Sequence, residues 1–243
     1  YKRQFYRFPR IDYKLLKQHS EGLVVSTACV GGLASSMIFS EFPEKTFAEF
    51  HPNLVDDPDT AQRIMQRLEN MTDRFVDAVG EDNFYLEVQF NRLKQQHLVN
   101  HHLLRHADMT GIPLLATADS HYYSPDKWEA RELYKKLGWM GNNPTPLPEF
   151  EDLKCELYPK NAQQMWDEFL ESYPLYDFYK GNEELVKESI ERTHDIVWNE
   201  CEDTWVDGEA KLPKIVVPGK TPFKHLADLV KEALVREGLA DNK

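Results

Sequence analysis

The chain has 243 residues, enough for one large domain or two modest ones. Hydrophobic residues make up 41% of it, so it can build a packed core, and wholesale disorder is excluded. The formal net charge of −12 disfavours a protein that grips nucleic acid through its own overall field, although a local basic patch stays possible.

The three cysteines, Cys29, Cys155 and Cys201, are odd in number and far apart in the chain. They form no CxxC pair and indicate no disulfide framework, so a reducing cytoplasm is the simplest setting. No apolar run is long enough to cross a bilayer, and we therefore expect no membrane partner.

Three short apolar runs are predicted strands: GLVVSTACVGG (22–32), NFYLEVQF (83–90) and IPLLATADSHYY (112–123). Between them lie segments with helical spacing of apolar residues, at 33–42, 60–80 and 96–111, and a further helix is expected at 124–139. Strands separated by helices are typical of an α/β fold with a parallel sheet, whose chemistry sits at the carboxyl ends of the strands.

The composition changes near residue 141, where GNNPTPLPEFED packs three prolines into a few residues. Three helices are predicted beyond it, at 161–173, 182–200 and 221–239. We therefore divide the chain into an α/β part (1–141), a linker (142–155) and a mainly helical region (156–243).

The most informative residues end the third strand. Strand side chains alternate, so Leu115, Thr117, Asp119 and His121 are predicted to share one face that turns polar at its carboxyl end. A carboxylate and an imidazole there suit Zn²⁺ or Mn²⁺. The alternative is an aspartate that caps the next turn beside a surface histidine, which is the commoner meaning of an Asp-x-His pair seen alone.

Two further residues end the other strands. Cys29 could offer a thiolate to a metal, although a lone cysteine is more often a buried core thiol. Glu87 could be a ligand, a partner of a basic group, or a carboxylate that orients a metal-bound histidine, and we favour the last role. On the helix 96–111, His97 and His101 are spaced to share a metal, but without an HExxH glutamate a surface or helix-packing role is favoured.

Several segments resemble one family. PRIDYKLLKQHSEGLVVSTACVGG, DNFYLEVQ and GIPLLATADSHYYSPDKWEARE are similar to the second half of the PHP (polymerase and histidinol phosphatase) domain of C-family replicative DNA polymerases, the DNA polymerase III alpha family. ELYPKNAQQMWDEF, ESIERTHDIVWNEC and KLPKIVVPGKTPFKHLADLVKEALVREGL resemble downstream segments of that family in the same order. The resemblance covers nearly the whole chain.

The resemblance implies a partial, distorted β/α barrel of the PHP kind, followed by a helical region that leads towards the polymerase palm and thumb. The family's Asp-x-His pair falls on Asp119 and His121, and its Ser-x-Cys position falls on Cys29. These residues would be metal ligands, with Asp119 and His121 catalytic, in a phosphoesterase or 3′–5′ exonuclease site. The implied ions are zinc or manganese there, and magnesium in the parent polymerase.

The sequence also departs from the family. It contains no His-x-His motif and lacks the polymerase aspartate triad, so the chain alone is expected to hold part of the PHP site and not to polymerise DNA. The implied partners are DNA through the complete polymerase, the rest of the polymerase or a complementing half, a proofreading exonuclease subunit and the sliding clamp. The alternatives are a non-catalytic docking scaffold and a stand-alone PHP-type phosphoesterase; the helical tail argues against the latter.

Overall fold

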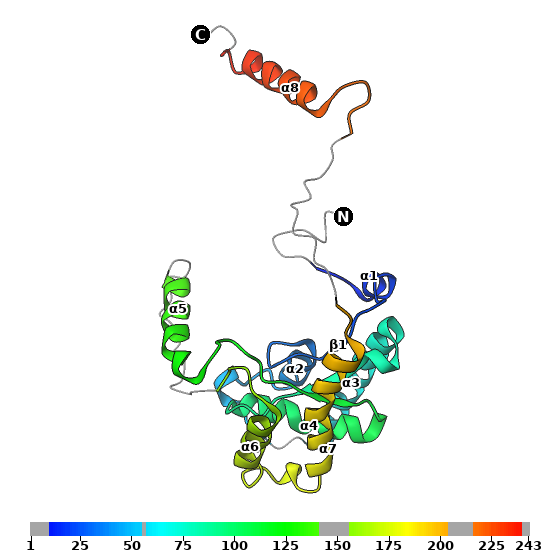
Figure 1. The fold of residues 1–243 in the computed structure, drawn as a ribbon, viewed down its shortest axis with the longest axis vertical. Coiled ribbons are helices and arrows are strands. Elements are labelled where there is room, and N and C mark those ends of the chain that lie inside the picture. Colours follow the sequence, from blue (N-terminus) through cyan, green and yellow to red (C-terminus); the bar gives the residue numbers. More distant parts are fainter. Residues whose placement is uncertain (1–9, 55–56, 141–155, 204–215, 240–243) are drawn as a thin grey trace. The chain divides into compact units, whose positions relative to one another are not determined.

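The computed structural model describes residues 10–54, 57–140, 156–203 and 216–239. The chain divides into two compact units, Tyr1–Cys201 and Glu202–Lys243. The helices labelled in Figure 1 and the short helical turns have the following bounds: α1 Tyr13–Gln18, α2 Leu33–Phe39, η1 Phe47–Glu49, α3 Pro58–Val79, η2 Glu81–Asn83, α4 Lys94–Thr110, η3 Pro125–Lys127, α5 Trp128–Met140, α6 Ala162–Ser172, η4 Asp177–Tyr179, α7 Glu183–Asp195, η5 Ile196–Glu200 and α8 Pro222–Arg236.

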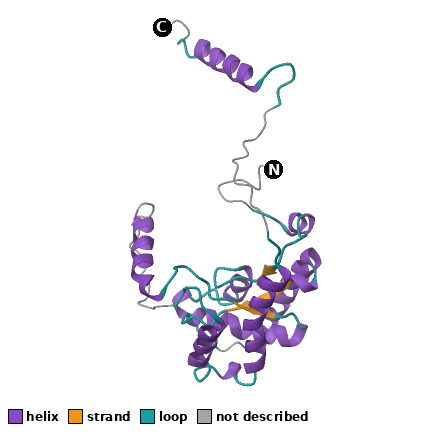
Figure 2. Ribbon diagram, in the orientation of Figure 1, coloured by secondary structure: helices purple, strands orange, loops and turns teal. Residues whose placement is uncertain are grey.

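The first unit contains a small parallel sheet, with strands β1 (Val25–Ser26), β2 (Phe84–Val88) and β3 (Leu114–Ala116) in that spatial order. Figure 2 shows these short strands surrounded by helices. The predicted α/β class is confirmed, and the sheet is open, as a partial barrel would be.

The first and third strands are shorter than the sequence predicts, and the backbone shows why. Ala28 has φ 60° and Asp119 has φ 46°, so the chain enters the left-handed region soon after β1 and β3 and stops being extended. The strict alternation of side chains therefore ends before Cys29 and before Asp119.

The longest helix, α3, follows its sequence signals. The Asp57 carboxylate accepts from the backbone N–H groups of Asp59 and Thr60, which caps the helix start, and Gly80 ends it with φ 91°. Ile64 and Leu68 are fully buried on one face, as the predicted spacing requires.

The hydrophobic core joins the sheet to helices from both predicted regions. Leu86, Leu98 and Leu114 are fully buried, and Phe169 and Tyr179 from the later helical region are buried in the same cluster. The first compact unit thus takes in α6 and α7 and runs to Cys201. The predicted linker 142–155 lies outside the described residues, so the boundary placed there stays a prediction.

Helix α7 packs along the outer edge of β3. The Arg192 guanidinium donates to the carbonyl of Leu114, and the Thr193 hydroxyl donates to the carbonyl of Ala116 at 2.7 Å. Free carbonyls on an edge strand invite pairing with another strand. These two side chains occupy them, so this edge of the sheet is closed.

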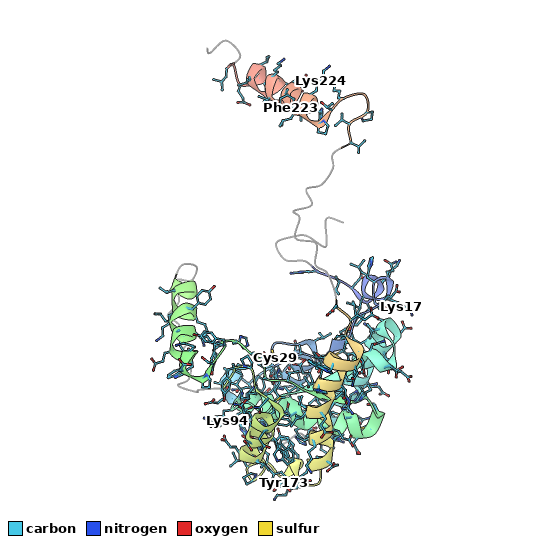
Figure 3. All side chains as sticks on the ribbon, in the orientation of Figure 1. Lys17, Cys29, Lys94, Tyr173, Phe223 and Lys224 are labelled. Atoms are coloured by element: carbon cyan, nitrogen blue, oxygen red, sulfur yellow. The ribbon has the colours of Figure 1, made fainter. Side chains whose placement is uncertain are left out.

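The described part of the second unit is mainly α8. The Thr221 hydroxyl accepts from the backbone N–H of Lys224, and Pro222 occupies the first helical position. Phe223, labelled with Lys224 in Figure 3, is 81% exposed. Among the helices that the structure describes, none is long and apolar enough to span a bilayer.

Candidate functional site

Asp119 and His121 meet just beyond the carboxyl end of β3. The imidazole Nε2 of His121 lies 3.3 Å from Oδ1 of Asp119. The aspartate side chain is 19% exposed and the histidine 46% exposed, so the pair is reachable from solvent. The left-handed backbone of Asp119 redirects its side chain, and the pair therefore forms in a turn instead of along a strand face.

The backbone beside this pair is held by a segment from much later in the chain. The carbonyl of Leu157 accepts from the N–H of His121 at 2.8 Å and from the N–H of Tyr122 at 3.2 Å. In return, the N–H of Leu157 donates to the Tyr122 hydroxyl at 3.1 Å. Leu157 is only 4% exposed, so this clamp ties the candidate site to the segment that leads into α6.

The Leu157 segment is itself anchored by ion pairs. Lys160, whose side chain is 1% exposed, lies 2.8 Å from Glu168 on α6, and its ammonium sits 4.4 Å from the centre of the Tyr158 ring. Burial raises the pKa of Glu168, while the hydrogen bond from Lys160 acts in the opposite direction. Arg92, just after β2, pairs with Glu156 at 3.4 Å. The sequence did not indicate these contacts, because Lys160 precedes the helix that carries Glu168, and Arg92 lies 64 positions before Glu156.

Replacing Tyr122 with phenylalanine tests the clamp. The change removes the acceptor for the Leu157 N–H, so it is expected to lower the free energy of unfolding by about 1 kcal/mol. It should also speed hydrogen exchange at the Leu157 amide, which NMR can follow. The matched control is Tyr134→Phe, since Tyr134 is 77% exposed on α5, and it should change neither quantity. Equal exchange rates at the Leu157 amide in both variants would show that the Tyr122 hydroxyl does not hold this amide.

Glu87 ties the three strands together at the carboxyl end of the sheet. Its carboxylate accepts from the Thr117 hydroxyl at 2.6 Å, from Nε2 of Gln89 at 3.0 Å, and from the Ser26 hydroxyl. Its own N–H donates to the Thr27 hydroxyl at 2.8 Å. Within the part of the chain that the structure describes, Glu87 makes no hydrogen bond to Asp119 or His121. The role predicted for it, orienting a metal-bound histidine, therefore stays a prediction.

Cys29 lies in the turn between β1 and α2 and is partly buried (Figure 3). Its carbonyl accepts from the Gly32 N–H and from the Ser35 hydroxyl, each at 2.8 Å. A Cβ on Gly32 would lie 2.3 Å from the Thr27 carbonyl oxygen, so only glycine fits this turn.

The donors present do not by themselves fit a metal ion. Within residues 10–54, 57–140, 156–203 and 216–239, no group of three or more His, Cys, Asp or Glu side chains could hold one. Asp119 and His121 come together, and Cys29 does not join them in such a group. A zinc site in a protein uses three or four protein ligands, so two donors fall short.

The histidines of α4 pack inside the protein. Nδ1 of His97 lies 2.7 Å from the Tyr179 hydroxyl, and Nε2 of His106 lies 3.1 Å from the Thr72 hydroxyl. Burial lowers the pKa of His97 to about 4 and that of His102 to about 3, since a buried imidazolium is poorly solvated. Of the two roles predicted for these histidines, surface or helix packing, His97, His102 and His106 have the second, since each is at most 2% exposed.

Comparison with known proteins gives the family context of this geometry. The PHP domain model matches residues 1–91, a range that includes Cys29 and Glu87 and ends before Asp119 and His121. The DNA polymerase III subunit alpha of Aquifex aeolicus is 26% identical over 236 residues, which is 96% of this chain and 18% of that protein. The Chlamydia muridarum subunit is 34% identical over 190 residues, 77% of this chain and 14% of the relative.

A third relative extends the same pattern. The alpha subunit of Borreliella burgdorferi is 30% identical over 165 residues, or 68% of this chain and 12% of its own length. The chain thus spans less than a fifth of the length of each of these relatives. The chain is similar to part of the DNA polymerase III alpha subunit over most of its own length, and its first 91 residues match the PHP domain model.

Proposed function

We propose that this chain is the part of an alpha-type replicative DNA polymerase that carries the later portion of the PHP domain and the segment leading towards the polymerase core. We further propose that Asp119 and His121 contribute to a metal-dependent phosphoesterase or 3′–5′ exonuclease site. The observation that carries the second proposal is the contact between Nε2 of His121 and Oδ1 of Asp119 at the carboxyl end of a parallel sheet.

The proposed site requires donors beyond the described residues. Asp119 supplies a carboxylate and His121 an imidazole, which are the donor types that Zn²⁺ and Mn²⁺ accept. Because this pair alone falls short of a complete set, the proposal is that a further part of the polymerase, or a complementing half, supplies the rest. DNA would then be reached through the complete polymerase, and a proofreading subunit and a sliding clamp would be its partners.

The test uses the complete protein or complex that contains this chain, purified through a tag on it. We expect DNA synthesis on a primed template, and metal-dependent release of nucleotides from DNA 3′ ends. Asp119→Ala should lower the nucleotide release by about 10–100-fold, the usual effect of disturbing a metal site, and leave DNA synthesis within about two-fold. Glu81→Ala, an exposed carboxylate in η2, is the control and should leave both activities unchanged.

Two results would contradict the proposal. If the purified complex does not synthesise DNA on a primed template, the proposal that the chain is part of a DNA polymerase is wrong. Nucleotide release that is equal in wild type and Asp119→Ala would remove Asp119 from the site.

The second candidate is a non-catalytic PHP scaffold that docks a proofreading or replisome partner. It is favoured by one observation: the Glu87 carboxylate is fully engaged with Ser26, Gln89 and Thr117. In this case Asp119→Ala would leave both DNA synthesis and nucleotide release unchanged. The two candidates therefore differ in the nucleotide-release assay alone.

A further inference from the structure

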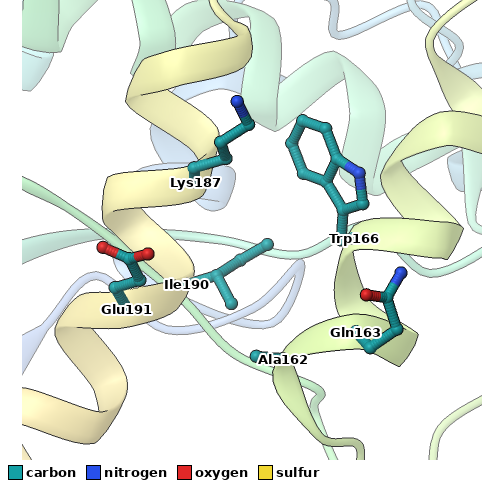
Figure 4. A pocket seen from close by; sticks show the side chains of 6 residues that line it. All are labelled: Ala162, Gln163, Trp166, Lys187, Ile190 and Glu191. Atoms are coloured by element: carbon teal, nitrogen blue, oxygen red, sulfur yellow. The ribbon is translucent and has the colours of Figure 1, made fainter.

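A surface pocket of about 240 Å³ lies between α6 and α7, and neither Asp119 nor His121 lines it. Figure 4 shows Trp166 on one side, Lys187 and Ile190 on the other, and Glu191 at the rim. The pocket is lined by Ala162, Gln163, Trp166, Lys187, Ile190 and Glu191.

The apolar walls of the pocket are fixed by the core. Ile190 is only 5% exposed, and Trp166 packs against the core with its ring centre 5.1 Å from that of Phe169. Both residues sit on helices, so the pocket does not depend on a loop. Its volume is below the 300 Å³ or more of a typical small-molecule site and matches a single large side chain.

A cation already occupies one side of the indole. The ammonium of Lys187 lies 5.4 Å from the centre of the Trp166 ring and 3.2 Å from Oε2 of Glu184. A tryptophan face attracts cations through its quadrupole. The chain's own lysine thus shows that this indole can hold a positive charge.

The surroundings of the pocket are acidic. Helix α6 carries three acids and no lysine or arginine, and α7 carries five acids with one lysine and one arginine. That arginine, Arg192, is turned to the carbonyl of Leu114 at the edge of β3. The exposed carboxylate of Glu191 lines the pocket, and the same two helices also expose the carboxylates of Asp167 and Glu188. The local charge therefore favours a cationic ligand and opposes a phosphate.

We propose that this pocket binds an arginine side chain from a basic segment of a partner protein. The planar guanidinium stacks on Trp166 and pairs with the carboxylate of Glu191, an arrangement that a lysine ammonium cannot match. An apolar neighbour of that arginine can rest on Leu170, which is 46% exposed and lies one helical turn after Trp166. Lys187 acts as a built-in competitor for the indole.

The test titrates the whole chain with N-acetyl-Gly-Arg-Gly-amide and follows backbone amide signals of α6 and α7 by NMR. We expect saturable shifts around the pocket. Glu191→Gln should weaken binding about five-fold or more, because the charged pair is lost. Lys187→Ala should tighten it about two- to five-fold, because the competing cation is gone. Asp195→Asn, an exposed acid at the end of α7, is the matched control and should stay within two-fold of wild type.

Trp166→Leu should abolish the stacking contribution, and its unfolding curve is measured to show that the variant folds. Glu191→Gln and Lys187→Ala change exposed side chains, so they test the proposal even if Trp166→Leu fails to fold. Three results would overturn it: no saturable shift with the arginine peptide, equal binding of N-acetyl-Gly-Glu-Gly-amide or dAMP, or weaker binding in Lys187→Ala. None of these results bears on the nucleotide-release assay.

Discussion

Replacing Glu87 with alanine is expected to lower the free energy of unfolding by about 2–4 kcal/mol. The carboxylate receives hydrogen bonds from Ser26, Gln89 and Thr117, which come from or follow β1, β2 and β3 respectively. Removing it leaves these donors without their shared acceptor in a partly buried site, and each lost partner costs on the order of 1 kcal/mol or more. Equilibrium unfolding in urea measures the loss.

A conservative change separates charge from shape at this position. Glu87→Gln keeps the size of the side chain but turns an amide NH2 towards groups that also donate, so about half of the loss is expected. The control is Glu81→Ala, an exposed carboxylate, which should stay within about 0.5 kcal/mol of wild type. A loss equally small for Glu87→Ala would mean that Glu87 does not hold the strands together, and the carboxylate would then be available for other chemistry.

Stability is expected to fall steeply as the pH drops from about 6.5 to about 4.5. Burial lowers the pKa of His97 to about 4 and of His102 to about 3, below the ordinary histidine value of 6.5. In this range the unfolded chain takes up protons at these rings while the folded chain does not, so acid favours unfolding. Proton uptake by each of these two histidines in the unfolded chain is expected to lower the free energy of unfolding by about 2–3 kcal/mol between pH 6.5 and pH 4.5.

The other two rings of α4 act in the same direction. Burial is the main cause that lowers the pKa of His101 and of His106, with Arg105 adding to the effect at His101. Glu69 and Asp73 act against it at His106. Urea unfolding at a series of pH values measures the combined dependence.

Two variants make this prediction specific. His102→Phe removes one titrating group. The loss of unfolding free energy between pH 6.5 and pH 4.5 should therefore be smaller by about 2–3 kcal/mol than in wild type. Ile64→Val removes a buried methylene and no titratable group, so it should lower stability by about 1 kcal/mol equally at every pH. The same pH slope in wild type and His102→Phe would contradict a neutral, buried His102.

Local pattern was enough to predict the elements of the first unit. The spacing of Ile64, Leu68 and Met71 predicts the buried face of α3, and the apolar runs predict the three parallel strands. The strands ended early because Ala28 and Asp119 adopt left-handed backbone, which no pattern of hydrophobic residues signals. Strand alternation predicts that Asp119 and His121 share a face; their side chains do lie 3.3 Å apart, but beyond the end of the strand, and their role as metal ligands stays a prediction.

Contacts between distant segments could not be predicted from one sequence. Leu157 and Glu156 lie at the start of the predicted helical region, yet the first clamps the backbone of His121 and the second pairs with Arg92. Thr193 looks like an ordinary helical residue, and only the packing of α7 on β3 gives its hydroxyl the Ala116 carbonyl. Such roles depend on which elements pack against each other. The spacing of apolar residues within one helix or strand does not indicate which other elements it will contact.

The most direct test of the proposed site is the Mn²⁺ and Zn²⁺ content, after equilibrium dialysis, of the complete protein or complex that contains this chain, measured beside Asp119→Ala and His121→Ala. We predict that wild type retains more metal than either variant, that both variants fall to the same level, and that Glu81→Ala matches wild type. Metal content that is the same in wild type and in Asp119→Ala would contradict a role for the Asp119–His121 pair in binding metal.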